Sequence, residues 1–172
     1  MISAYDYLTE VRGIHPSVAE YASWEESDAE YVIPYFDAQG RRRTERYHNP
    51  RGKPKYRSKT GGARHLYCVE NVRFPAIVLC EGEIDTLSVL SAGLKGVGVS
   101  GVYGFFRPWT HLIEHADDIA IAFDGDAAGR EAATKLKGLL PQARIVTPDS
   151  DLDLNDILRD EGAEALKEFL SE

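Results

Sequence analysis

The sequence predicts an α/β fold in which a parallel β-sheet is flanked by helices and follows a small N-terminal α+β subdomain. Two observations carry this prediction. From about residue 75 onward, short strands that are apolar throughout alternate with helical segments, as in parallel sheets covered on both faces. The first 74 residues lack that alternation and hold a strongly basic segment. We therefore expect two domains, over 1–74 and 75–172, that meet in NVRFPA at residues 71–76.

The first domain is predicted to begin with two short helices and to continue with short strands. The helical segments are SAYDYLTEV at 3–11 and PSVAEYAS at 16–23. EYVIPYFDAQGRRRTERYHN at 30–49 has the pattern of two strands around a DAQG turn. KPKYRSKTGGARHLYCVENV at 53–72 predicts two more extended pieces. We therefore expect an α+β scaffold that carries the basic residues.

The second domain contains four apolar strand segments, each followed by a helical segment. The expected strands cover 76–82, 96–102, 118–126 and 143–148. The expected helices cover 83–94, 108–116, 127–140 and the tail from Asp153, which is the predicted N-cap. Since the carboxyl ends of parallel strands lie along one edge of a sheet, the active site is expected at that edge.

Charge is distributed unevenly along the chain. The formal net charge of −8 would by itself disfavour nucleic-acid binding, which relies on Lys and Arg. Residues 41–64 nevertheless hold ten of the twenty basic residues and one acid, Glu45, so this segment carries +9 and the remainder −17. A basic segment beside an acidic body suits a metal-dependent enzyme that acts on polyphosphates, and a solvated charged loop is the alternative.

Composition also bears on location. No run approaches the ~18 apolar residues that a membrane helix needs, and MISAYDYLTEVRG lacks the charged-then-apolar pattern of a signal peptide. We expect a cytoplasmic protein without membrane contact. The two cysteines, Cys68 and Cys80, lie in apolar stretches without a second Cys at metal-ligand spacing, so we expect buried thiols.

Acidic residues follow three of the predicted strands. Glu81 closes the first strand, Asp124 and Asp126 close the third, and DSDLDLND at 149–156 follows the fourth. Residues two apart on a strand point to the same side, so the side chains of Asp124 and Asp126 are expected to converge. Carboxylates at such range repel one another unless a cation compensates them, and Mg²⁺ or Mn²⁺ prefers oxygen ligands.

The acidic pattern also allows other interpretations. Asp124 and Asp126 could cap a helix in an exposed turn. A calcium-binding loop fails on spacing, because Ala128 and Lys135 occupy positions that need oxygen ligands. A phosphatase with an aspartyl nucleophile leaves the acids of EGEID unexplained. In that stretch Asp85 is expected in the first helical turn, so a local role there and a metal contact both stay open.

LCEGEIDTLS, AFDGDAAGREAA and DLNDIL together resemble the three acidic motifs of the Toprim fold, in the form found in bacterial DnaG-type primases and phage primase-helicases. Upstream, GKPKYRSKTGGARHLYCVENV is similar to the basic segment of the primase core, and VIPYFDAQGRRRTERY to its strand-turn-strand. The similarity runs from about residue 30 to about residue 162 and covers most of the chain. It implies that residues 75–172 form a Toprim catalytic domain behind a basic, nucleic-acid-binding N-terminal subdomain.

The resemblance implies catalytic roles for Glu81, Asp124 and Asp126, with Mg²⁺ or Mn²⁺ as cofactor. The implied metal ligands are Glu81, Asp85, Asp124, Asp126 and Asp153. The cations that match the family's template or nucleotide contacts are Arg46, Lys55, Arg57 and Arg64. The third motif departs from the DxD form of many DnaG-type primases, because Asn155 follows Asp153 and Leu154. Arg130 is expected to brace the acids by an ion pair, with phosphate contact as the alternative.

The function that the resemblance implies is that of a DNA primase catalytic core, a nucleotidyltransferase that makes short RNA primers on single-stranded DNA from ribonucleoside triphosphates. The alternatives are a Toprim nuclease, which uses water in place of a 3′-hydroxyl, and a non-catalytic nucleic-acid-binding or recombination-mediator protein. Neither a zinc-binding module nor a helicase phosphate-binding loop is recognisable in the sequence. A separate zinc-binding module or a replicative helicase is therefore an expected partner, as would suit a phage protein. Such a protein would be expected in the host cytoplasm.

Overall fold

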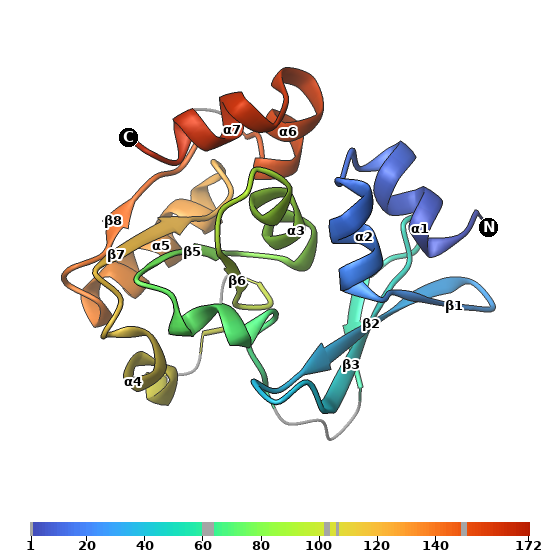
Figure 1. The fold of residues 1–172 in the computed structure, drawn as a ribbon, viewed down its shortest axis with the longest axis horizontal. Coiled ribbons are helices and arrows are strands. Elements are labelled where there is room, and N and C mark those ends of the chain that lie inside the picture. Colours follow the sequence, from blue (N-terminus) through green and yellow to red (C-terminus); the bar gives the residue numbers. More distant parts are fainter. Residues whose placement is uncertain (1, 60–63, 102–103, 106, 149–150) are drawn as a thin grey trace.

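A computed structural model of the chain describes residues 2–59, 64–101, 104–105, 107–148 and 151–172, and it contains two four-stranded sheets (Figure 1). The N-terminal sheet is antiparallel in the order β1-β2-β3-β4. Its strands are β1 Glu25–Ser27, β2 Glu30–Phe36, β3 Arg42–His48 and β4 Tyr56–Ser58. The second sheet is parallel in the order β6-β5-β7-β8. Its strands are β5 Ala76–Cys80, β6 Gly96–Gly98, β7 Asp118–Ala122 and β8 Arg144–Ile145.

The expected N-terminal hairpin is confirmed as β2 and β3. Asp37 closes its turn, because one carboxylate oxygen accepts hydrogen bonds from the backbone N–H groups of Gln39 and Arg41, both at 3.0 Å. Of the two extended pieces expected over 53–72, the first forms β4. The second is wrong: apart from a single bridge between Tyr67 and Gly98, the chain there turns into a 3₁₀ helix at Val69–Arg73. Residues 60–63 of that region lie outside the described part.

Both short N-terminal helices are confirmed. Helix α1, Ala4–Asp6, continues as a π-helix over Tyr7–Val11, and α2 covers Pro16–Ala22. Ser3 caps the first of them by accepting a hydrogen bond from the backbone of Asp6. The helices cover the inner face of the N-terminal sheet, where a cluster of aromatic rings is buried.

The parallel sheet is covered on both faces, as predicted. Side chains alternate along each strand, so that Val78 and Cys80 face one core cluster and Ile77 and Leu79 the other. The helices of this half are α3 Glu83–Ser91, α4 Thr110–Ile113, α5 Ala127–Leu139, α6 Leu154–Glu161 and α7 Ala163–Phe169. Helices α3, α6 and α7 pack on the first face, and α4 and α5 on the second. No described helix is both long and apolar enough to cross a bilayer.

Several elements are shorter than expected. Strand β6 stops at Gly98, because Ser100 and Gly101 turn the backbone into positive φ, at 64° and 102°. Of the helix expected over 108–116, only a 3₁₀ turn at Arg107–Trp109 and the four residues of α4 form. The helical tail breaks at Gly162, where φ is 93°, and so divides into α6 and α7. Residues 102, 149 and 150 lie outside the described part.

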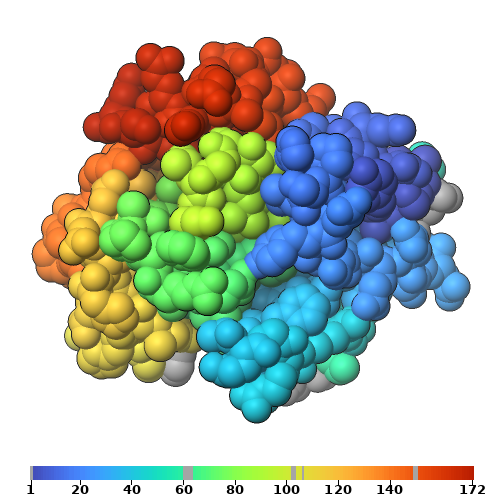
Figure 2. All heavy atoms as spheres, in the orientation of Figure 1, coloured from blue at the N-terminus to red at the C-terminus, as the bar shows by residue number. Residues whose placement is uncertain are grey.

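The two sheets share one apolar core. One cluster contains Tyr31 and Tyr35 of the N-terminal sheet together with Ile84 and Leu87 of α3. The space-filling view shows the N-terminal residues in blue directly against the green and red residues of the second half (Figure 2). We keep a boundary after residue 74 as a proposal, because it separates the two sheets. Both cysteines are buried free thiols, as expected.

Candidate metal and nucleotide site

The predicted acidic loops meet at the carboxyl edge of the parallel sheet. Glu81 follows β5, Asp124 follows β7, and the loop before α6 reaches the same place. A backbone hydrogen bond ties two of these loops together: Gly125 donates to the carbonyl oxygen of Leu152 at 3.1 Å. A cavity of about 310 Å³ opens here, and four of the five predicted metal ligands line it: Glu81, Asp85, Asp124 and Asp153.

Helix N-termini position two of these four acids. Asp85 lies in the first turn of α3 and is buried, with 8% of its surface exposed. Asp153 is the N-cap of α6, as predicted, and forms a reciprocal capping box with Asp156: its carboxylate accepts from the Asp156 backbone at 2.7 Å, and the return bond measures 3.2 Å. Asp153 therefore holds the start of α6 as well as facing the cavity, and Asp85 faces it from the first turn of α3.

Asp126 does not line the cavity. The expectation that it projects from the same strand as Asp124 is wrong, because β7 ends at Ala122 and the chain turns at Gly125. The exposed Asp126 is the N-cap of α5, and its carboxylate accepts the Gly129 backbone N–H at 2.7 Å. A metal contact by Asp126 stays a prediction.

Burial and mutual repulsion perturb the acids strongly. Burial, followed by the charge of Asp124, raises the pKa of Glu81 to about 7. Burial, followed by the charge of Asp153, raises the pKa of Asp124 to about 6. The same two causes raise the pKa of Asp85 well above its ordinary value. Because the raised pKa values reflect burial and repulsion between carboxylates, binding of a cation among these groups would be favoured.

The donor set fits a hard divalent cation. One carboxylate oxygen of Glu81, Oε2, and one of Asp85, Oδ1, are buried without a hydrogen-bond partner. Buried acceptors without partners are costly, and Mg²⁺ or Mn²⁺ satisfies them through oxygen ligation. Within the described ranges no three His, Cys, Asp or Glu side chains already form a complete ligand set. Water or substrate oxygens would therefore supply part of the coordination.

The opposite wall of the cavity comes from the N-terminal half and is basic and aromatic. Its residues are Arg12, Arg46, His48, Lys55 and Tyr56. Arg46 on β3 donates from Nη1 to Glu83 at 2.6 Å, and its guanidinium carbon lies 5.4 Å from the centroid of the Tyr56 ring. Lys55 is exposed and makes no ion pair with any described residue. The structure thus brings together two of the four predicted cations and four of the five predicted acids.

The other two predicted cations lie elsewhere. Arg57 pairs with Glu30 and lies over the Tyr47 ring, 3.7 Å from its centroid, and the exposed Arg64 does not line the cavity. Their contact with nucleic acid stays a prediction.

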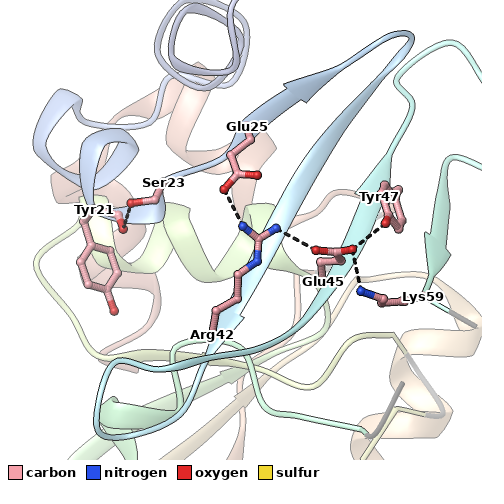
Figure 3. A network of polar contacts seen from close by, with 7 residues as sticks. All are labelled: Tyr21, Ser23, Glu25, Arg42, Glu45, Tyr47 and Lys59. Carbon is pink, nitrogen blue, oxygen red and sulfur yellow. Dashed lines mark hydrogen bonds and ion pairs between the residues drawn. The ribbon is translucent and has the colours of Figure 1, made fainter. Parts of the chain in front are cut away.

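Much of the basic segment is neutralised by ion pairs. Arg42 binds both Glu25 and Glu45, and Lys59 binds Glu45 (Figure 3). Six of the ten cations of residues 41–64 have an acidic partner: Arg41, Arg42, Arg43, Arg46, Arg57 and Lys59. The four that have no ion pair within the described structure are Arg51, Lys53, Lys55 and Arg64. Free positive charge is therefore concentrated in the loop at 51–55, beside the cavity.

Two further residues of the site were not predicted or were predicted differently. Arg12 lines the cavity, and its Nε donates to the Tyr7 hydroxyl at 3.0 Å. It is the only Lys or Arg among the first 40 residues, and that isolation is the one signal the sequence offers. Arg130 binds no acid among the described residues: it donates to the carbonyl oxygens of Gly125 and Pro148 at 2.9 and 2.7 Å, so it braces the acidic loop through its backbone.

Asn155, the departure in the third motif, is a structural residue. It is fully buried, and its Nδ2 donates to the Arg12 carbonyl oxygen at 2.7 Å and lies 2.9 Å from the Ser88 hydroxyl oxygen. These bonds tie α6 to α3 and to the segment that carries Arg12. An aspartate here would lose both donors, which explains why an amide suits this position.

Asn155→Asp should lower the free energy of unfolding by about 2–4 kcal/mol, because it removes two donated hydrogen bonds and buries a charge that Arg12 Nη1, 3.4 Å from Oδ1, offsets only in part. Chemical denaturation monitored by circular dichroism would measure the loss. Asn49→Asp is the matched control, because the Asn49 side chain only accepts, from the Arg51 backbone at 3.0 Å, and a carboxylate accepts equally well. Equal stability of the two variants would contradict the role given to Asn155.

Comparison with known proteins agrees with this geometry. The Toprim-like family matches residues 78–158, which include the three acidic loops. Gene 57 protein of Mycobacterium phage D29 is 33% identical over 119 residues, which cover 68% of this chain and 78% of that protein. The chain belongs to the Toprim-like family. A DNA primase of Borreliella burgdorferi is 33% identical to this Toprim-like chain over 101 residues, which are 56% of this chain and 19% of the primase.

Solved primase structures share the fold. The Aquifex aeolicus primase, with its zinc-binding and RNA polymerase domains, superposes with a TM-score of 0.80 at 20% identity, over 96% of this Toprim-like chain and 54% of that one. The primase fragment of the bacteriophage T7 primase-helicase gives a TM-score of 0.79 at 22% identity, over 94% and 72%. The predicted Toprim fold and the resemblance to primase cores are confirmed. This chain spans about half of the Aquifex chain and about a fifth of the Borreliella primase.

Proposed function

We propose that this protein is the catalytic core of a DNA primase, which joins ribonucleotides into short primers on single-stranded DNA. The observation that carries the proposal is the polarity of the cavity. Buried carboxylate oxygens of Glu81 and Asp85 lack partners on one wall, and the Nε of Arg46 is buried without a partner on the other. A metal-bound triphosphate satisfies both walls at once, because its cation meets the acids and its oxygens meet the guanidinium.

On the acidic wall, Glu81, Asp85, Asp124 and Asp153 would hold Mg²⁺ or Mn²⁺, with Asp126 next to them. Bound there, the metal supplies charge neutralisation for the phosphates and Lewis acidity at the reacting phosphorus. The acids are fixed by a strand end and by helix N-termini, so they are positioned before substrate binds. Preformed charge of this kind is the main contribution of a protein to phosphoryl transfer.

On the basic wall, Arg46, Lys55 and Arg12 would bind phosphate oxygens of the nucleotide or template. The guanidinium groups offer planar pairs of N–H donors, and the Lys55 ammonium offers an exposed point charge. The free cations of residues 51–55 extend this surface out of the cavity. We infer that the template strand passes over this loop, because single strands bind along positively charged grooves.

Partners follow from the same proposal. The similar T7 protein is a primase-helicase, and the Aquifex chain includes a zinc-binding domain. We propose that a replicative helicase or a zinc-binding module cooperates with this core on single-stranded DNA. Such an enzyme works where DNA is replicated, in the bacterial or host cytoplasm.

A primer-synthesis assay tests the function. The protein is incubated with single-stranded DNA, labelled ribonucleoside triphosphates and Mg²⁺ or Mn²⁺, and the products are separated by size. Short labelled oligomers that depend on metal and DNA are the expected result. Cleavage of DNA without nucleotides would indicate the nuclease instead. Binding of single-stranded DNA without any product would indicate the binding or mediator protein.

Lys55→Gln should flatten the salt dependence of binding to single-stranded DNA. Removing one interaction between a cation and a phosphate lowers the slope of log K against log salt by about 0.7 for a single strand. Fluorescence anisotropy with a labelled oligonucleotide at several salt concentrations measures that slope. Lys59→Gln is the control, because the Lys59 ammonium is already paired with Glu45 at 3.1 Å. Equal slopes for wild type and Lys55→Gln would remove Lys55 from the interface.

A further inference from the structure

Glu83 is a buried acid of the first acidic motif that is not among the predicted metal ligands. It lies at the start of α3 with 2% of its surface exposed, and it lines the same cavity. Its Oε1 accepts hydrogen bonds from the Tyr35 hydroxyl at 2.5 Å and from the Arg46 Nη1 at 2.6 Å. The Tyr35 hydroxyl also lies 2.7 Å from the Ser100 hydroxyl. This carboxylate therefore joins the N-terminal sheet to the edge of the parallel sheet.

The position of Glu83 calls for an explanation beyond folding. A buried ion pair costs desolvation that its attraction barely offsets, and a well-packed apolar pair often stabilises a fold more. Glu83 also adds negative charge next to Glu81 and Asp85, where the acids already repel one another. The only cation bonded to Glu83 in the described structure is Arg46. We therefore expect the role of Glu83 to lie in its effect on Arg46.

One N–H group of the Arg46 guanidinium is hydrogen-bonded to Glu83, and another has no partner. Its side chain is 17% exposed; Nη1 is bonded to Glu83, and the guanidinium lies near the Tyr56 ring. Its Nε is buried and has no partner. With one end fixed by a carboxylate and one face near an aromatic ring, the guanidinium loses most of its rotational freedom. Arg46 lines the cavity that the four acids also line.

We propose that Glu83 is a positioning residue: it orients Arg46 so that the free N–H edge of the guanidinium meets a phosphate group of a nucleotide bound at the acidic wall. This inference rests on the proposed function for the identity of the ligand as a nucleoside triphosphate. Glu83 itself touches no substrate. Its carboxylate acts through the direction that it gives to Arg46, and through the Tyr35 hydroxyl that fixes the carboxylate in turn.

Nucleotide binding to single and double variants tests the proposal. The variants are Glu83→Gln, Arg46→Gln and the two together, in the full chain. Isothermal titration with ATP and Mg²⁺, and with inorganic tripolyphosphate and Mg²⁺, measures affinity, and thermal unfolding measures stability. Glu25→Gln is the matched control, because it removes one carboxylate partner from Arg42, another arginine of β3 (Figure 3). Arg42 still pairs with Glu45 in this variant, and it does not line the cavity.

Glu83→Gln and Arg46→Gln should each weaken both ligands about ten- to a hundredfold, the effect of losing one charge-assisted hydrogen bond. The double variant should bind as Arg46→Gln does, because Glu83 acts only through Arg46. Glu25→Gln should bind as wild type does. Wild-type affinity in Glu83→Gln, or a double variant weaker than Arg46→Gln by the full Glu83→Gln factor, would overturn the proposal.

Two safeguards keep the result decisive. If Glu83→Gln does not fold, the comparison of Arg46→Gln with the double variant answers the same question, because any difference between them shows an action of Glu83 that bypasses Arg46. The outcome is also separable from the proposed function. Coupled loss of nucleotide affinity in a protein that makes no primers would keep the inference and reject the function. Primer synthesis in a protein whose Glu83 and Arg46 variants show no coupled loss of nucleotide affinity would keep the function and reject the inference.

Discussion

Asp124→Asn should reduce primer synthesis by a factor of about 10³ or more, because it removes one acid from the wall that would hold the metal. Asp124 lies two residues after the end of β7 and lines the cavity together with Glu81, Asp85 and Asp153. The amide keeps the shape of the side chain, so the loss reports charge and ligation. Gel analysis of labelled primers at saturating Mg²⁺ gives the rate.

The matched control lies at the other end of the same strand. Asp118 begins β7, is exposed and pairs with Arg144 at 3.1 Å. Asp118→Asn should leave the rate within about twofold, since surface ion pairs contribute little to the fold. Primer synthesis that survives Asp124→Asn, or that Asp118→Asn removes equally, would reject the acidic cavity as the catalytic centre.

Asp124→Asn should also stabilise the metal-free protein. Burial and neighbouring acids hold the pKa of Asp124 at about 6 and that of Glu81 at about 7, against ordinary values of 3.8 and 4.5. In chelator at pH 7.5, Asp124→Asn should raise the free energy of unfolding by roughly 1–3 kcal/mol, after allowance for solvent screening. For a chain of this length, each kcal/mol of added stability raises Tm by about 2–4 °C.

The pH dependence has a definite sign. The folded protein keeps protons on Asp124 and Glu81 that the unfolded chain has already lost, so their contribution to stability falls as pH rises from about 4 through 7. His48 acts in the opposite direction: burial, followed by the charge of Arg12, lowers its pKa to about 4, so its contribution is lost as pH falls from 6.5 through that value. The difference between Asp124→Asn and wild type cancels the His48 contribution and isolates the acids.

Differential scanning calorimetry in chelator from pH 4 to pH 8 measures that difference. The gain from Asp124→Asn should be absent near pH 4 and largest above pH 7, and Mg²⁺ should remove it by stabilising wild type alone. Asp118→Asn serves again as the control and should show no such trend. A gain that does not vary with pH would contradict mutual repulsion among the acids.

Much of the fold could be predicted from local sequence. The strands β5 and β7 are continuous apolar runs, and α3 and α5 have helical spacing and good helix formers, so their residues alone specify them. The short β6, the break at Gly162 and the 3₁₀ helix at Val69–Arg73 could not be predicted as readily. Their form depends on backbone dihedrals and packing that propensity does not determine.

The acidic half of the site was predictable and the basic half only in part. Glu81, Asp124 and Asp153 follow strands whose ends meet by the rule for parallel sheets. Asp126 was misplaced because the strand ends earlier than its apolar pattern suggests. Contacts such as Tyr35 to Glu83, 48 residues apart, depend on how two sheets pack, and a single sequence carries no local signal for them.

The core shared by the two sheets limits how the site can move. Because N-terminal side chains and α3 pack into one apolar cluster, and because Tyr67 and Gly98 exchange backbone hydrogen bonds of 2.9 and 3.0 Å, the halves cannot rotate about a hinge without opening that core. The cleft therefore keeps a nearly constant width and does not close around a ligand. With the proposed function, substrate would enter a preformed space, and release of each lengthened primer would depend on the strand sliding past the 51–55 loop.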